Sequence, residues 1–406
     1  MWSSSVTTGT ELSLAGITAK TLAQEFGTPT FFIDEADFRE RALAWDKALK
    51  DSFGPHAGTV YYASKAFICT ELARWINELG IGIDVSTGGE MAVALAGGID
   101  PSKIEVHGNN KSVAEIDRAV SLGVKTIVMD SLFEIERVAA AAKKHGVRQA
   151  VMLRLTPGIE AHTHEKISTA HEDVKFGFSI ASGAAATAVT AVLSHASLEL
   201  LGFHCHVGSQ IFGTDSFELA ATRIIALMAE CKSKHGIELP ELDLGGGYAI
   251  AYMPGDVTVE PEDVLPALSA VVKRECAAAG LALPIISIEP GRNIVGPTTF
   301  TLYEVGTVKD VVLEDGRTRR YISVDGGMSD NIRPSIYGAE YSAVLADRVS
   351  TAAHALSRVV GKHCETGDIV IRDIELPSDI APGDLLATPA TGAYGRSMAS
   401  NYNHVP

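Results

Sequence analysis

The sequence of 406 residues is poor in cysteine and in basic side chains. Its five cysteines are an odd number, widely spaced and without a Cys-x-x-Cys pair, which argues against a disulfide framework and a structural zinc site. We expect most of them to be small buried side chains. With 34 basic and 50 acidic residues the net charge is −16, which argues against nucleic acid as a partner, because phosphate binding needs a concentrated basic surface.

Export and membrane signals are also lacking. Residues 1–20 have neither a basic start nor an apolar core, so we expect no secretory signal. No run approaches the roughly 18 apolar residues that a membrane span requires. The alanine-rich segment 184–193 is too short for a span and predicts a helix of a globular domain. We therefore expect a cytoplasmic protein without a membrane partner.

The chain does have a regular alternation of short apolar runs and helical segments. The first five runs start at residues 59, 81, 104, 126 and 150, so their spacing is nearly even. Such alternation predicts parallel strands joined by right-handed crossovers. Eight units favour a (β/α)₈ TIM-type barrel, an α/β fold, over an open doubly wound sheet. The predicted strands are 59–65, 81–86, 104–109, 126–130, 150–155, 200–206, 241–245 and 285–289.

The pattern changes after Gly296–Pro297, where helical segments become scarce. Glu314–Gly316 reads as a hairpin turn between two strand-like runs, and the run 28–33 is a plausible further strand of the same sheet. We predict a second, mostly antiparallel β domain. The expected domains are a barrel over 34–297 and a β-rich domain from 1–33 with 298–406. Its expected strands are 299–312, 320–324 and 369–375.

A long loop is expected at 157–179, after the fifth barrel strand. A loop in this position is often an active-site lid. A solvated surface insertion explains the segment equally well, so both interpretations stay open.

Lys65 ends the first barrel strand, directly after two tyrosines, an alanine and a serine. A lysine that closes an apolar run usually lies on the surface with its ammonium group in water. In a barrel, however, Lys65 faces the polar ends of the other strands. A partly desolvated lysine loses its proton more easily and attacks carbonyl carbon. We therefore predict that Lys65 is a Schiff-base lysine.

The ends of the other strands supply the rest of a site, since the carboxyl ends of barrel strands build active sites. Three consecutive glycines let backbone amides approach an anion, and the loops after strands 7 and 8 often hold a phosphate. A phosphate cradle, an amine, an imidazole to stack on a flat ring and a carboxylate for a pyridine nitrogen describe a pyridoxal phosphate site. These strand ends are Asp84–Ser86, His107–Asn110, His204–Gln210, Asp243–Gly247 and Glu289–Arg292.

His204 and His206 are two residues apart on one strand, so they point to the same side. A metal-dependent hydrolase is therefore the alternative, with further ligands from His107, Asp84 or Glu289. That alternative leaves Lys65, the glycine triplet and Arg292 without roles. Stacking on the cofactor accounts for one histidine and core packing for the other, so we expect no metal.

These motifs resemble the barrel-type pyridoxal phosphate decarboxylases of alanine racemase-like fold, and most closely the diaminopimelate decarboxylases. Two departures stand out: Ala249 occupies a position where a glycine is expected, and the chain stops soon after Asn403, so we expect an incomplete β domain. The matched motifs cover nearly the whole chain. They are 62–65, 84–86, 175–179, 206–210, 243–247, 289–292, 333–337, 364–368 and 392–394.

The resemblance implies that Lys65 holds the cofactor, that His206 stacks on its ring and that Glu289 meets its nitrogen. It also implies Cys364 as the proton donor. The remaining cofactor contacts implied by the resemblance are Asp84, Ser209, Gly245, Gly246, Gly247, Gly291, Arg292 and Tyr394.

The substrate implied by the resemblance is meso-2,6-diaminopimelate, decarboxylated to L-lysine and CO₂. Two arginines hold its far carboxylate and Glu365 its far ammonium group. The pair Cys364–Glu365 together with Arg333 argues against ornithine, arginine or lysine as the substrate, since the related ornithine decarboxylases have an aspartate after the matching cysteine and their substrates lack the far carboxylate. The second carboxylate pocket argues against a racemase, and the β domain against a carrier without catalysis. The implied substrate contacts are Arg292, Arg333, Tyr337, Glu365 and Tyr394.

The resemblance also implies a homodimer with shared active sites. Cys364 lies in the second predicted domain and Lys65 in the first. A loop carrying Cys364 would enter the partner's barrel, so that each site is built from two chains.

Overall fold

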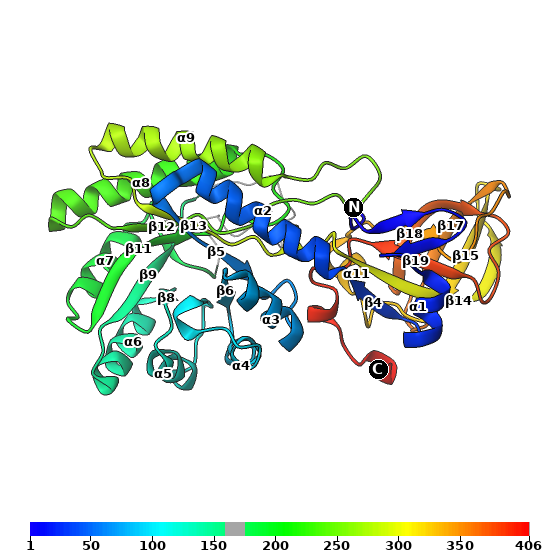
Figure 1. Cartoon of the computed structure of the whole chain (residues 1–406), viewed down its shortest axis with the longest axis horizontal. Helices are drawn as coiled ribbons and strands as arrows, with labels where there is room; N and C mark the ends of the chain where they lie inside the picture. The colour runs from blue at the N-terminus through cyan, green and yellow to red at the C-terminus, as the bar shows by residue number, and fades with distance from the viewer. Residues whose placement is uncertain (159–174, 406) are drawn as a thin grey trace. The chain divides into compact units, whose positions relative to one another are not determined.

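The computed structural model describes residues 1–158 and 175–405. Most of the predicted lid or insertion at 157–179 lies outside these residues. The chain divides into two compact units (Figure 1). One, called here the barrel unit, comprises Arg41–Ala249 and Val259–Gly291; the other, the β unit, comprises Met1–Glu40, Ile250–Thr258 and Arg292–Pro406.

Eight parallel strands close on themselves in the barrel unit, which confirms the predicted barrel and excludes the open sheet. Closure is seen where β9 pairs with both β8 and β11, and where β5 pairs with both β13 and β6. A short strand, β10 (Phe178–Ser179), adds to β9. The barrel strands are β5 (Ala57–Ala63), β6 (Gly82–Val85), β7 (Ile104–Val106), β8 (Thr126–Met129), β9 (Gln149–Thr156), β11 (Leu198–Cys205), β12 (Glu241–Asp243) and β13 (Ile285–Ile288).

Helices follow most of the strands and surround them (Figure 1). Their ends follow from local sequence. Ser112 and Glu115 form a capping box at the start of α5, and Gly123 ends that helix in a left-handed conformation. Asp34 accepts a hydrogen bond from the Asp37 N–H at the start of α2. The helices are α2 (Glu35–Phe53), α3 (Thr70–Leu79), α4 (Gly88–Ala96), α5 (Val113–Leu122), α6 (Leu132–His145), α7 (Ala184–Leu193), α8 (Asp215–His235) and α9 (Pro261–Ala279), with short 3₁₀ turns η1 (Gly54–His56) and η2 (Pro101–Lys103).

Strand register determines which polar side chains share a level of the barrel. Asp84 on β6 is paired with Glu105 on β7. On the other side, His204 on β11 is paired with Asp243 on β12. All four side chains are buried. The barrel interior therefore contains ionisable side chains as well as apolar ones. A core that serves only stability rarely buries such groups.

The β unit is built around β14, a strand of 14 residues. It pairs antiparallel with β15, β19 and β4, so the predicted strand near 28–33 does join this sheet. The one parallel pair among the described strands of this sheet is β15 with β17. The strands are β4 (Thr30–Ile33), β14 (Thr299–Val312), β15 (Thr318–Val324), β16 (Val344–Leu345), β17 (His354–Val360), β18 (Ile369–Pro377) and β19 (Leu385–Pro389).

Several short elements of the β unit were not predicted. The N-terminal residues form a small sheet and a helix, and Leu12, Ala19 and Leu22 pack with Phe300 in one apolar cluster. Strands of two or three residues are too short for an alternation of side chains to be recognised. These elements are β1 (Val6–Thr8), β2 (Leu12–Leu14), β3 (Ile17–Thr18), α1 (Ala19–Phe26), α10 (Arg292–Val295), α11 (Arg333–Tyr337), η4 (Arg396–Met398) and η5 (Tyr402–His404).

Candidate active site

Lys65 lies two residues beyond the end of β5 and is half-buried. Burial is the main influence on the ionisable groups around it: it raises the pKa of Asp84 and lowers those of His107, His204 and His206. The ammonium charge of Lys65 acts on all four as a lesser influence that lowers their pKa values. The ends of β5, β6, β7 and β11 thus bring these side chains together around one amine.

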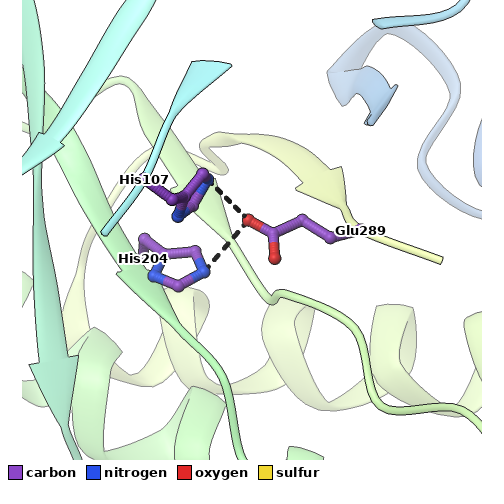
Figure 2. A group of neighbouring side chains, drawn as sticks. All are labelled: His107, His204 and Glu289. Carbon is purple, nitrogen blue, oxygen red and sulfur yellow. Dashed lines mark ion pairs between the residues drawn. The ribbon is translucent and has the colours of Figure 1, made fainter. Parts of the chain in front are cut away.

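Glu289 directly follows β13 and is almost fully buried, with 3% of its surface exposed. Its Oε1 lies 3.0 Å from Nε2 of His107 and 3.1 Å from Nε2 of His204 (Figure 2). The two imidazole rings meet edge to face, with centroids 4.8 Å apart. Sequence analysis assigned His204 to core packing, whereas the structure pairs it with a carboxylate.

The buried carboxyl groups near Glu289 in the barrel differ from it in pKa. Burial, together with the charge of neighbouring carboxylates, raises the pKa of Asp84, Glu105 and Asp243 well above the usual range. Burial also raises the pKa of Glu289, but the two imidazoles outweigh it and hold that pKa well below the usual range. Glu289 therefore stays ionised at neutral pH.

The histidines of the site are neutral. Burial lowers the pKa of His107 to about 3 and lowers that of His206 well below its usual value. Nδ1 of His206 accepts a hydrogen bond from the Gly246 N–H at 3.4 Å, which places the ring proton on Nε2. A neutral imidazole fixed in this way can lie against a flat aromatic ring without bringing a charge to it.

The glycine triplet 245–247 packs closely against neighbouring backbone. A Cβ on Gly246 would lie 2.1 Å from the Glu289 carbonyl oxygen, and one on Gly247 would lie 2.3 Å from that of Gly208. Gly247 also has a φ of +112°, which side chains rarely adopt. Only glycine at these positions therefore allows the loops after β11, β12 and β13 to pack this closely.

A second cluster lies entirely within the β unit. Arg292 and Arg333, each 7% exposed, both donate hydrogen bonds to the phenolic oxygen of Tyr252, the latter at 3.0 Å. Arg333 also donates to Tyr341, and the Arg292 guanidinium lies 4.6 Å from the ring centroid of Tyr394. Burial raises the pKa of Tyr252, but the two arginines outweigh it, so the net pKa is lowered.

Known proteins resemble the chain over nearly its whole length. The family model described as "Pyridoxal-dependent decarboxylase, pyridoxal binding domain" matches residues 35–296. The diaminopimelate decarboxylase of Mycobacterium tuberculosis is 53% identical over 396 residues, which cover 97% of this chain and 88% of that protein. That of Mycobacterium leprae is 51% identical, covering 96% and 82% respectively. The chain belongs to the diaminopimelate decarboxylase family.

Solved structures of the family agree. Diaminopimelate decarboxylase from M. jannaschii in complex with L-lysine superposes with a TM-score of 0.89 at 29% identity, over 99% of this chain and 91% of that one. Membership makes this chain a pyridoxal phosphate-dependent carboxy-lyase, so the expected fold, cofactor and decarboxylase activity on diaminopimelate are confirmed. None of the helices in the described residues is long and apolar enough to cross a membrane.

Family membership also decides against the metal-dependent hydrolase. Two sets of side chains in the described part of the chain have ligand atoms within 4.8 Å of one another, namely His107, His204 and Glu289, and Glu105, Asp243 and Glu289. The short contacts of the two imidazoles with Glu289, at 3.0 and 3.1 Å, account for the first set. The first set also differs from the metal site considered above, which was built on His204 and His206, because it contains His107 in place of His206.

The residues of the barrel unit fit the family's cofactor. Lys65 offers an amine for the aldehyde, Glu289 an ionised carboxylate for the ring nitrogen, and His206 a neutral ring for stacking. Both carboxylate oxygens of Asp84 are buried and have no hydrogen-bond partner among the described residues. A buried polar atom left in this state is costly in a closed core and is explained by a ligand.

The remaining family residues lie on loops of the β unit. Cys364 and Glu365 are exposed, so the thiol is not the buried core side chain that its residue type favours. The loop is held by Asp368, whose carboxylate accepts from the N–H groups of Met328 and His363 at 2.6 and 2.8 Å. Tyr337 ends α11 and is half-buried, as is Tyr394. Cys205, Cys231 and Cys276 are buried, as expected of most cysteines.

Tyr252 and Tyr341 were not predicted from the sequence, and His107 was named only as a further ligand in the alternative metal site. Tyr252 lies in the segment between β12 and α9, which by position belongs to the barrel but by contacts belongs to the β unit. The signal for His107 was its place directly after β7, at the same end of the barrel as Glu289 after β13.

Proposed function

We propose that the residues described above carry out the family's reaction, the loss of CO₂ from the D-configured end of meso-2,6-diaminopimelate to give L-lysine. The observation that carries this proposal is that a half-buried amine, Lys65, and an ionised carboxylate, Glu289, lie at the same end of the barrel. Pyridoxal phosphate, when bound, takes up the electron pair that remains at Cα when CO₂ leaves.

In this proposal Lys65 would hold the cofactor through its aldehyde group. Glu289 keeps the ring nitrogen protonated, and His206 lies against the ring face. The glycine triplet, Ser209 and the Gly291–Arg292 turn surround the phosphate, supported by the close backbone packing of these loops. Asp84, buried beside Lys65, and Tyr394 complete the cofactor site.

Substrate recognition is assigned to the β unit. Arg292 and Arg333 hold the far carboxylate in charge-assisted hydrogen bonds, and Glu365 meets the far ammonium group. Tyr337 and Tyr394 line the same site. Cys364 donates the proton to Cα after CO₂ has left, and its exposure on a loop fits a group that must reach a substrate.

We also propose a cytoplasmic homodimer with shared active sites. The Cys364 loop is exposed in the single chain, as expected of a segment that completes a partner's site. The proposed domains remain the barrel over 34–297 and the β-rich domain from 1–33 with 298–406.

The direct test is CO₂ release from meso-diaminopimelate compared with ornithine, lysine and arginine. We expect release from diaminopimelate alone, and borohydride treatment of the holoenzyme should attach the cofactor to Lys65. Faster release from ornithine or lysine would overturn the substrate assignment. Attachment at another lysine would overturn the proposed role of Lys65.

A further inference from the structure

Two imidazoles contact the same carboxylate oxygen. Nε2 of His107 and Nε2 of His204 lie 3.0 and 3.1 Å from Oε1 of Glu289 (Figure 2). All three side chains are at least 90% buried. They come from three strands, β7, β11 and β13, so the fold itself brings them together.

This arrangement determines where the protons are. Burial lowers the pKa of both histidines, so each ring is neutral and carries one N–H. An ionised carboxylate can only accept hydrogen bonds. Each ring therefore carries its proton on Nε2, because an unprotonated Nε2 would place its lone pair against the carboxylate.

The same contacts distinguish Glu289 from its neighbours. Asp84, Glu105 and Asp243 are buried with it, and repulsion among the carboxylates disfavours more than one ionised group. Nε2 of His107 is also hydrogen-bonded to Oε1 of Glu105 at 3.0 Å, but the raised pKa of that carboxyl group makes it a neutral partner. Of these four carboxyl groups in the described residues, Glu289 is the one with two imidazole nitrogens within 3.1 Å of a single oxygen.

We propose that His107 and His204 are positioning residues, which keep the negative charge of the barrel interior on Glu289 and leave its Oε2 for the ring nitrogen of the cofactor. This inference rests on the proposed role of Glu289. With both imidazole nitrogens against Oε1, the carboxylate cannot rotate without losing both of these short contacts. A carboxylate that is held ionised keeps the ring nitrogen protonated, which is the state that accepts electrons from Cα.

The first experiment uses the wild-type apoprotein with ¹⁵N-labelled histidine. We expect both rings to be neutral at pH 7, with the proton on Nε2, and their signals to be assigned by loss in His107→Gln and His204→Gln. A proton on Nδ1 of either ring, or a charged ring, would overturn the proposal. This measurement needs no cofactor and no activity.

The second experiment compares leucine and glutamine at each position in the holoenzyme, with the cofactor ring nitrogen labelled with ¹⁵N. Glutamine keeps a neutral N–H donor and leucine removes it. The ring nitrogen should stay protonated in both glutamine variants and lose its proton in the leucine variants, whose kcat should fall about 10- to 100-fold, as when groups that orient a ligand are removed. His195→Leu, which breaks a surface pair with Glu136, is the matched control and should change neither signal nor kcat.

Failure of this inference is distinguishable from failure of the proposed function. A ring nitrogen unprotonated in the wild type would overturn the role of Glu289 itself. A nitrogen protonated in the wild type and in both leucine variants would overturn only the positioning role. Should the leucine variants fail to fold, the proton positions in the wild-type apoprotein decide the question.

Discussion

The guanidinium group of Arg333 donates a hydrogen bond of 3.0 Å to the phenolic oxygen of Tyr252. Arg292 donates to the same oxygen, so one phenol holds two buried cations side by side. Two guanidinium groups held close together repel each other, and the shared oxygen reduces that repulsion. The pair is thereby held in one orientation, as the proposed binding of a carboxylate requires.

Tyr252→Phe removes this shared oxygen while it keeps the ring. Because hydrogen bonds to charged groups contribute about 1.5–3 kcal/mol each, we expect the KM for diaminopimelate to rise about tenfold or more, with kcat little changed. The measurement is steady-state kinetics of Tyr252→Phe and of the control variant Tyr321→Phe. Tyr321→Phe is the control, since Tyr321 also lies near an arginine, Arg358, with 5.8 Å between guanidinium carbon and ring centroid. A lower kcat at unchanged KM would contradict the orienting role.

Arg333→Lys keeps the charge but loses the planar, forked donor. We expect KM for diaminopimelate to rise about 10- to 100-fold, since each charge-assisted hydrogen bond lost from a buried site is worth about 1.5–3 kcal/mol. Arg333→Ala should be worse still. Arg317→Ala, an exposed arginine of the hairpin in the same unit, should leave the kinetics unchanged. Normal kinetics in Arg333→Ala would remove the arginine from the substrate site.

The barrel was predictable because its signals are local. The evenly spaced apolar runs predict strands that the structure confirms. The helices between them begin and end at local signals, with serines at 112 and 131 and glycines at 123 and 146. The small N-terminal sheet was not predictable, since strands of two or three residues carry no period.

The candidate site was predictable only in part. Lys65, His206 and Glu289 follow strands, so their position in the sequence placed them at one end of the barrel. The contacts of His107 and His204 with Glu289 depend on strand register and on rotamers, which the sequence does not reveal. The Arg292–Tyr252–Arg333 cluster depends on a nine-residue segment, Ile250–Thr258, joining the β unit.

Asp330 in the β unit makes stability dependent on pH. Burial, opposed in part by hydrogen bonds from Tyr303 and the Gly327 N–H, raises its pKa to about 6. The folded state therefore binds this proton more tightly than the unfolded state, whose pKa is near 3.8. The stabilisation is fully present below pH 4 and is lost as the pH rises through 6.

Asp330→Asn removes that dependence and keeps groups able to pair with Tyr303 and Gly327. The free energy of unfolding of the variant, relative to that of the wild type, should increase between pH 4 and 6 and stay constant above pH 6. The total increase should be at most about 3 kcal/mol, since one pKa unit corresponds to about 1.36 kcal/mol. Urea unfolding from pH 4 to 8 measures the difference. A difference that is flat across this range would show that Asp330 does not titrate there.

The last prediction concerns the shared sites of the proposed homodimer. Lys65 belongs to the barrel unit and Cys364 to the β unit. If the Cys364 loop completes the partner's site, each site combines the barrel of one chain with the loop of the other. Lys65→Ala then damages the barrel part of a site and Cys364→Ala damages the loop part. Each should be nearly inactive as a homodimer. After subunit exchange, half of the dimers are mixed and one of their two sites is intact, so about a quarter of wild-type activity should return.

The matched control mixes Lys65→Ala with Glu289→Gln. Both changes lie in the barrel unit, so every site of a mixed dimer contains one defective barrel and no activity should return. Exchange is verified independently by mass spectrometry of differently tagged chains. Verified exchange of Lys65→Ala with Cys364→Ala that restores nothing would mean that each site is built within one chain. Recovery in that mixture together with none in the control requires that Cys364 acts on the partner's barrel.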